Sequence, residues 1–164
     1  RFTMSPWTTR AQAFVLGAYA GAAFGFLEGL SYGLLGIQDD LADWWQIMLI
    51  RGGSTSLHVL CSGLAGAGWW YWTRAQRHRT AIALWATAVA IHAGWNGFFT
   101  AIDSRVFVLD TLSNRTLEVI AYGVVIVVSL LMIVAIPIVS RRLRDDPLPP
   151  ADDTPLGTMT PWLA

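Results

Sequence analysis

The stretch Ile91–Phe99, I-H-A-G-W-N-G-F-F, places a histidine and an asparagine four residues apart within an uncharged apolar run. On a helix, this spacing puts His92 and Asn96 on one face. No acidic residue, arginine or lysine occurs from Thr80 to Ile102, a length sufficient to cross the hydrocarbon core of a bilayer. Polar side chains at that depth are costly and usually mark a functional site. The stretch therefore predicts a transmembrane helix that carries part of such a site.

The overall composition is that of a membrane protein. Of the 164 residues, 54% are hydrophobic and only 13% are charged, and the 11 basic residues balance the 11 acidic ones. This balance gives no bulk positive field that would favour nucleic acid as a partner. The single cysteine, Cys61, excludes an intrachain disulfide and a cysteine-based zinc site. Because the chain begins at Arg1 without an initiator methionine, we expect residues upstream of it.

Towards the N-terminus, an apolar run from Ala11 to Gln38 contains a single charged residue, Glu28. We expect a retained transmembrane helix rather than a signal peptide, because the hydrophobicity continues far past the small residues near position 20. Its glycines repeat the GxxxG pattern that lets another helix approach closely, at Gly17, Gly21, Gly25, Gly29 and Gly33. Glu28 and Tyr32 share a helical face with this strip and are expected to look into the packed interior. The strip is also long enough to serve a homodimer, which the sequence leaves open.

Residues 37–50 are mixed, and their leucine, tryptophan and methionine pattern predicts a short amphipathic helix at the membrane interface. A second span begins at Arg51. Its polar residues fall on one stripe at spacings of about three, four and seven: Arg51, Ser54, Thr55, His58, Cys61 and Ser62. After the third span and a polar loop at 103–116, a nearly aliphatic fourth span runs from about Leu117 to Ser140. The fourth span offers no chemistry and is predicted to be a packing wall.

Together these segments predict an all-α fold, a polytopic transmembrane bundle of about four spans plus the short interfacial helix. Residues 1–140 would form the membrane-embedded domain, and the Pro- and Asp-rich residues 141–164 would form a disordered cytoplasmic tail. Among the 11 basic residues, only Arg51, Arg105 and Arg115 fall on the side opposite the termini. By the positive-inside rule, both termini of this multi-pass cell-membrane protein are expected in the cytoplasm.

The polar groups within the spans are expected at a common depth. At about 1.5 Å per residue, Glu28 lies roughly 26 Å into its run, and His92 and Asn96 lie roughly 20–26 Å into theirs. His58 lies roughly 10 Å into a helix that runs in the opposite direction. All four groups would therefore fall in the outer half of the bilayer, where three neighbouring helices can direct them at one wet pocket.

Three motifs carry a resemblance to a known family. They are Gly25-Phe26-Leu27-Glu28-Gly29-Leu30-Ser31-Tyr32, then Arg51 through His58 to Gly66, and His92-Ala93-Gly94-Trp95-Asn96. In this order and spacing, across roughly residues 14–100, they resemble the PrsW family of intramembrane proteases, which is similar to the CAAX-prenyl endopeptidases. The resemblance implies a bacterial hydrolase that cleaves peptide bonds within the membrane, with catalytic residues at Glu28, His58, His92 and Asn96. By analogy with related proteases, its substrate would be a single-span membrane protein such as an anti-sigma factor.

The chain departs from the family pattern at one point. The family usually carries a paired Glu-Glu-x-x-Lys/Arg motif on a helix upstream of the Glu28 helix, and this chain has none. Either the chain is a fragment of a protein with at least one more helix, or this member has lost the pair. The second case would weigh against catalysis.

The chemistry of these residues suggests how they would act. Glu28 would serve as general base toward a water molecule, and a histidine would orient that water or protonate the leaving amine. Asn96, a neutral donor, would stabilise the tetrahedral oxyanion, a contribution of about 3 kcal/mol where it has been measured elsewhere. Arg51 would hold a substrate carboxylate or pair with Glu28, and Tyr32 is assigned to substrate binding. This mechanism needs no metal or other cofactor.

Three other interpretations stay open. Zinc bound by Glu28, His58 and His92 would make a metalloprotease, although no H-E-x-x-H motif is present. Haem ligated by His58 and His92 would leave Glu28 and Asn96 without a role. In the third interpretation, the polar groups hold helices together in a non-enzymatic scaffold or a substrate-binding pseudoprotease. The common depth and the family resemblance favour the protease.

Overall fold

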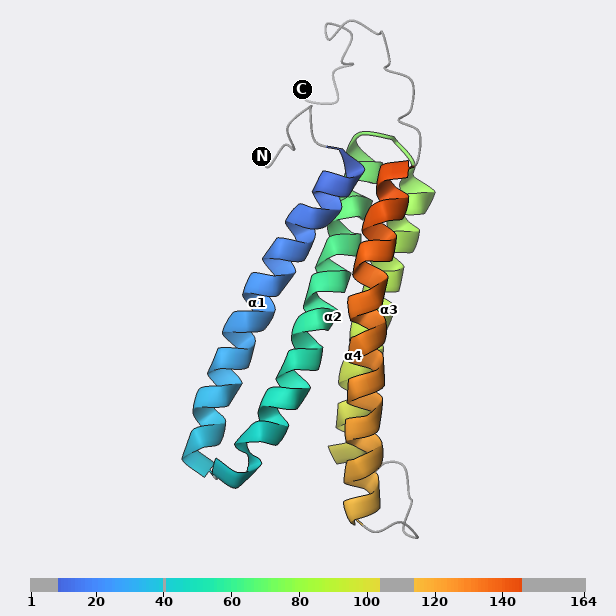
Figure 1. The fold of residues 1–164 in the computed structure, drawn as a ribbon. Coiled ribbons are helices and arrows are strands. Elements are labelled where there is room, and N and C mark those ends of the chain that lie inside the picture. The colour runs from blue at the N-terminus through green and yellow to red at the C-terminus, as the bar shows by residue number, and fades with distance from the viewer. Residues whose placement is uncertain (1–8, 40, 104–113, 146–164) are drawn as a thin grey trace, which may run out of the picture.

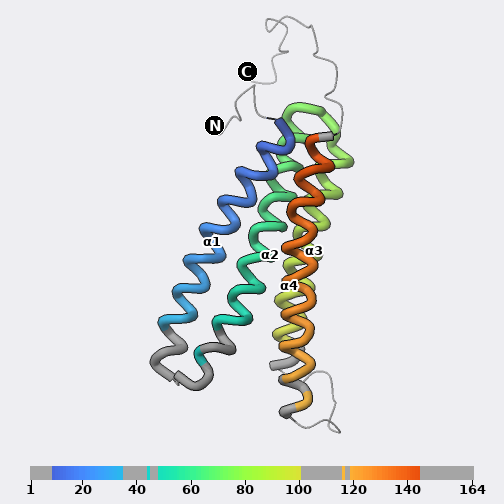
Figure 2. The backbone as a smooth tube through the Cα atoms, viewed as in Figure 1, coloured from blue at the N-terminus to red at the C-terminus, as the bar shows by residue number. Residues whose placement is uncertain are grey.

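Four helices in succession make up the fold. The computed structural model describes residues 9–39, 41–103 and 114–145 (Figure 1, Figure 2). Every regular element within these ranges is a helix: α1 (Arg10–Asp39), α2 (Leu41–Thr73), α3 (His78–Asp103) and α4 (Asn114–Asp145). The helices run alternately up and down, so that the start of α1 and the end of α4 lie at the same end of the bundle (Figure 1). The predicted all-α class is thereby confirmed.

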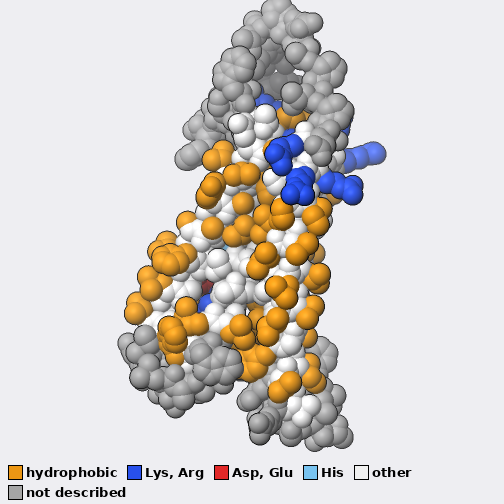
Figure 3. Space-filling model, viewed as in Figure 1, with side chains coloured by type: hydrophobic (Ala, Val, Ile, Leu, Met, Phe, Trp, Pro, Cys, Tyr) orange, Lys and Arg blue, Asp and Glu red, His pale blue; other side chains and the backbone are white. Residues whose placement is uncertain are grey.

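Three of the helices are long and apolar enough to cross a membrane, over Arg10–Leu34, His78–Thr100 and Val119–Arg144. Their outward faces carry large exposed apolar side chains, among them Leu16 and Leu131, and hydrophobic side chains spread over much of the face seen in Figure 3. Such a surface fits contact with lipid rather than water. The protein is therefore a membrane protein, and the count of four spans stays a prediction because α2 is not among these three helices.

Helix α2 occupies the centre of the bundle and packs against α1, α3 and α4. It has 33 residues and carries a polar stripe, and no stretch of it is among the three that are apolar enough to cross a membrane. Leu57 of α2 is fully buried, and Phe14 of α1, Trp95 of α3 and Val125 of α4 belong to the same buried cluster. On the polar stripe of α2, Ser54 and His58 are buried and Arg51 is partly buried, so polar groups lie inside the bundle, which is where a site within a membrane is expected.

Two predicted boundaries differ from those of the structure. The interfacial helix predicted over residues 37–50 is not a separate element: residues 37–39 end α1 and residues 41–50 begin α2, and their position at a membrane surface stays a prediction. Helix α4 continues to Asp145, past the predicted domain boundary at residue 140, because Arg141–Arg144 extend its last turns without a helix breaker. The remainder of the predicted tail, residues 146–164, and positions 104–113 of the predicted loop lie outside the described residues.

Glycines make the contact between α1 and α2. A Cβ atom at Gly21 would overlap the backbone of His58, and one at Gly17 would overlap that of Ser62. At Gly25, the added atom would lie 2.9 Å from the Cα of Thr55. The glycine strip therefore lets the two helices approach backbone to backbone, as its spacing predicts, and its partner is α2 of the same chain.

At the end where α1 starts, a buried arginine joins three helices. The Nε of Arg10 donates a hydrogen bond to the carbonyl of Leu143 on α4 at 2.6 Å. Its guanidinium carbon lies 6.0 Å from the centre of the Trp70 ring on α2. Exposed arginine side chains gather near this end of the bundle and are seen in blue in Figure 3. This geometry places the two terminal helix ends on one side, and the assignment of that side to the cytoplasm stays a prediction.

Candidate active site

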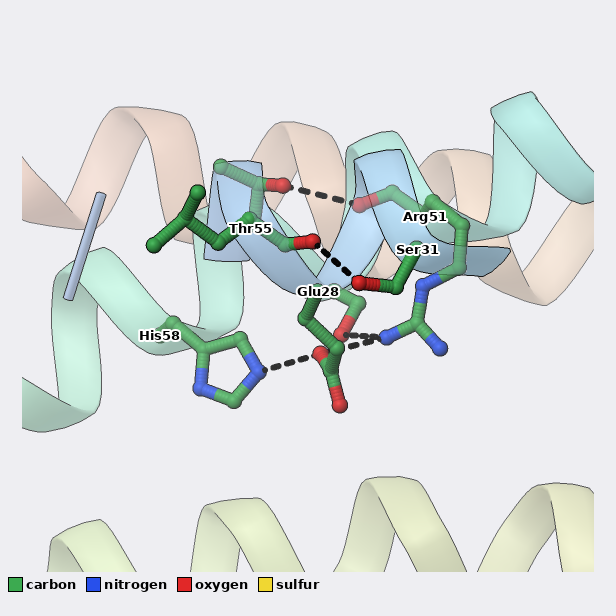
Figure 4. Close-up of polar contacts among 7 residues, drawn as sticks. Glu28, Ser31, Arg51, Thr55 and His58 are labelled. Atoms are coloured by element: carbon green, nitrogen blue, oxygen red, sulfur yellow. Dashed lines mark hydrogen bonds and ion pairs between the residues drawn. The ribbon is translucent and has the colours of Figure 1, made fainter. Parts of the chain in front are cut away.

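Glu28 on α1 is held by two side chains of α2. The Nη2 of Arg51 donates to Oε2 of Glu28 at 2.6 Å, and the Nε2 of His58 lies 3.0 Å from the same oxygen (Figure 4). Arg51 and His58 are seven residues apart, two helical turns, so both project from the same face of α2. The close α1–α2 approach at the glycines brings Glu28 within reach of both. One carboxylate oxygen is therefore fixed from two directions.

The three side chains are largely withdrawn from the surface. The exposed fractions of the side chains are 29% for Glu28, 16% for Arg51 and 9% for His58. In Figure 3, a small area of acidic and basic side chains is visible in a recess of an otherwise uncharged surface. A carboxylate in apolar surroundings needs a counter-charge and hydrogen-bond donors, and Arg51 and His58 supply both.

A second imidazole stands beside the first. His92 of α3 is partly buried, and its ring centre lies 5.1 Å from that of His58. The other carboxylate oxygen of Glu28 points away from Arg51 and His58, toward α3 (Figure 4). Helices α1, α2 and α3 therefore contribute an acid and two imidazoles to one level of the bundle, as the predicted common depth requires.

Arg51 makes further contacts besides that with Glu28. Its Nη2 also donates to Oγ of Ser54 at 2.8 Å, and its guanidinium carbon lies 4.4 Å from the centre of the Tyr32 ring. The Oγ1 of Thr55 donates to the carbonyl of Arg51 at 3.0 Å. The Nε of Arg51 is buried and has no hydrogen-bond partner among the residues that the structure describes. Nη2 thus makes both side-chain hydrogen bonds. The guanidinium does not bind the carboxylate of Glu28 with two nitrogens in parallel.

Two residues of the site were not singled out from the sequence. Phe24 lies one turn before Glu28, and its ring approaches His58 with 4.8 Å between ring centres. Although it touches a buried histidine, Phe24 is 57% exposed. Ser54 was recognised only as part of the polar stripe. The signal for both was helical spacing, four residues before Glu28 and three after Arg51.

The structure places five of the six predicted site residues together and leaves one apart. Glu28, His58, His92, Arg51 and Tyr32 form a continuous set of contacts. Asn96 lies one turn beyond His92 on α3, is exposed, and accepts a hydrogen bond from Thr100 through its backbone carbonyl at 2.9 Å. Among the described residues, no side-chain hydrogen bond joins Asn96 to the cluster, so its predicted role stays a prediction.

The comparison with known families shows to which family the chain belongs. The model of the PrsW family of intramembrane metalloproteases matches residues 2–136. The chain belongs to the PrsW family. None of the curated proteins and no solved structure gives a significant match. Membership of PrsW identifies the chain as an intramembrane protease in general terms, and confirms the resemblance seen in the three sequence motifs.

The description of PrsW proteins as metalloproteases raises the question of a metal ion. One carboxylate and two imidazoles, from Glu28, His58 and His92, are ligands that zinc commonly takes. Within the described ranges, however, no three His, Cys, Asp or Glu side chains are grouped so that they could hold one ion. The Oε2 of Glu28 is instead engaged by Arg51 and His58. The residue types fit a metal, whereas their arrangement in this PrsW chain fits a carboxylate–imidazole pair.

Proposed function

We propose that this chain is an intramembrane endopeptidase in which Glu28 activates the attacking water. The supporting observation is the asymmetry of its carboxylate: Arg51 and His58 engage Oε2, and the second oxygen points toward α3 (Figure 4). Two donors on one oxygen fix the orientation of the group. The second oxygen then accepts the proton of a water molecule as that water attacks the peptide carbonyl.

The two histidines take different roles in this proposal. The Nε2 of His58 donates to Glu28, so His58 orients the base. His92 lies beside it on α3 and passes to the leaving amine the proton that Glu28 took from the water, a type of step that contributes about 10²- to 10⁴-fold in rate. Asn96, one turn farther along α3, donates to the oxyanion of a substrate that lies against α3. Helices α1 and α2 thus supply the base and the group that orients it, and α3 supplies the groups that act on the oxyanion and the leaving amine.

The proposed substrate is a single-span membrane protein, for which an anti-sigma factor is the example that related proteases suggest. The site is enclosed by helices whose outer faces are apolar, so a substrate reaches it from the bilayer rather than from water. The exposed ring of Phe24, next to His58, would pack against an apolar side chain near the scissile bond. We also propose that both termini are cytoplasmic. A homodimer would have to form through a surface other than the glycine strip, which contacts α2.

The direct test is cleavage by the purified full chain in liposomes. A panel of tagged single-span membrane proteins is reconstituted with it, and the products are mapped by mass spectrometry. New termini within or next to the substrate span would support the proposal. A correctly folded chain that cleaves no member of the panel would favour the scaffold or pseudoprotease interpretation instead.

Replacing His92 by alanine is expected to lower kcat about 10²- to 10³-fold with little change in KM, because proton donation to the leaving group is a transition-state interaction. The matched control is His78→Ala at the start of α3, where the imidazole stacks on Trp72 with 4.2 Å between ring centres. The control should retain activity. An unchanged kcat for His92→Ala would remove this imidazole from the mechanism.

Zinc-dependent proteolysis is the second candidate function. The short distance between the His58 and His92 rings and the family description both favour it. Because Arg51 engages Glu28, we expect the purified chain to contain less than one zinc per molecule and to keep its activity in 1,10-phenanthroline. Elemental analysis and the cleavage assay check this. Loss of activity in the chelator, with recovery on adding zinc, would decide for the metalloprotease.

A further inference from the structure

The family is described as metalloproteases, whereas the described residues show no group that could hold a metal ion. One side chain, that of Arg51, accounts for this disagreement. Glu28, His58 and His92 are residue types that zinc proteases use as ligands, and the Nε2 of His58 lies 3.0 Å from Oε2 of Glu28. The guanidinium of Arg51 contacts the same oxygen that faces His58. We infer that Arg51 and a divalent metal ion are alternative partners of Glu28, and that Arg51 keeps this site free of metal. The inference rests on the proposed function only in using the same three residues.

Charge is the first reason. A guanidinium 2.6 Å from the carboxylate compensates its negative charge inside a largely apolar bundle. The same positive charge repels a cation approaching the two imidazoles, and charge interactions are strong where water is scarce. Without Arg51, the carboxylate of Glu28 would stand beside two imidazoles without the guanidinium as counter-charge, and carboxylate and imidazole are groups that bind a metal ion.

The second reason is that Arg51 is held incompletely. Its Nη2 alone contacts both Glu28 and Ser54, whereas strong arginine–carboxylate pairs use two nitrogens in parallel. Its Nε is buried without a hydrogen-bond partner among the described residues. Tyr32, whose side chain is about half exposed, offers the guanidinium a ring face at 4.4 Å. The hold of Arg51 on the carboxylate is thus a single contact rather than a paired one, so its effect on metal binding is a competition that an affinity measurement can detect.

The test uses the purified full chain and Co²⁺ as the probe, because Co²⁺ bound by carboxylate and imidazole absorbs visible light. We expect Arg51→Gln to bind one Co²⁺ per chain about tenfold more tightly than the wild type, or better. The double variant Arg51→Gln/Glu28→Gln should lose this gain. The matched control is Arg141→Gln, which removes the same charge from an exposed position near the end of α4 and should leave Co²⁺ affinity unchanged.

Two outcomes would overturn the inference. In one, the wild type binds a Co²⁺ ion as tightly as Arg51→Gln, so that the guanidinium does not compete with it. In the other, neither the wild type nor folded Arg51→Gln binds Co²⁺. If Arg51→Gln does not fold, Arg51→Met, which keeps much of the side-chain length without the charge, is measured in its place. Co²⁺ affinity is measured without any substrate, so this test of the metal inference is independent of the proposed proteolysis. The proteolysis is tested separately, by comparing cleavage by the wild type and by Glu28→Gln.

Discussion

Replacing Glu28 by glutamine is expected to lower cleavage about a thousandfold or more, to background, while the helical bundle still forms. The amide has nearly the same shape as the carboxylate, and its oxygen can still accept hydrogen bonds from Arg51 and His58. It cannot accept a proton from water at neutral pH. The loss should therefore appear in kcat, with little change in the binding of substrate.

Two measurements separate the loss of a base from a loss of folding. Circular dichroism reports the helix content of Glu28→Gln. The matched control, Glu118→Gln, makes the same chemical change on α4, which contributes no group to the site, and should cleave at the wild-type rate. Wild-type cleavage by Glu28→Gln would remove this carboxylate from the mechanism and the proposed function with it.

The substitution Gly21→Leu is expected to separate the two helices that form the site. An added Cβ at this position would lie 2.6 Å from the carbonyl carbon of His58, and that atom belongs to the backbone and cannot swing aside. Helix α1 must then move away from α2 at the level of His58. We expect a loss of about 2–3 kcal/mol in stability, as for other overpacked contacts, and a loss of cleavage because Glu28 no longer reaches His58.

The chain carries its own probe for this measurement. Cys61 is its single cysteine, and it is buried. A thiol-reactive dye should therefore react only as the bundle opens, and the midpoint of its thermal reaction curve reports stability. Gly123→Leu on α4 is the matched control, because a Cβ there meets no atom within 4 Å. Equal midpoints for Gly21→Leu and the wild type would contradict the assigned contact.

The positions of the helices could be predicted from the sequence because uncharged runs between arginines are unusually clear signals. The glycine spacing likewise predicted close helix contact, and the residue counts predicted that Glu28, His58 and His92 would lie at one level. Helical periodicity says which residues share a face. It does not say toward which neighbour that face is turned, so the identity of the partner of the glycine strip came only from the structure.

Two features of the site were beyond this reasoning. Arg51 has a long side chain with several low-energy conformations, so the sequence allowed either Glu28 or a substrate carboxylate as its partner. Asn96 shares a face with His92, but four residues place it about 6 Å farther along the axis. Two residues on the same face of a helix can therefore lie at different depths in the membrane. The sequence grouped Asn96 with the histidines, whereas in the structure it stands outside their contacts.

The hydrogen bond from Arg10 to the carbonyl of Leu143 has a practical consequence. It keeps the start of α1 next to the end of α4, and Glu28 lies roughly 27 Å away along α1. A fluorescent protein or affinity tag fused at the start of α1 or the end of α4 would sit remote from the proposed catalytic groups. For the same reason, a short linker joining these two helix ends would give a circular polypeptide that retains the bundle.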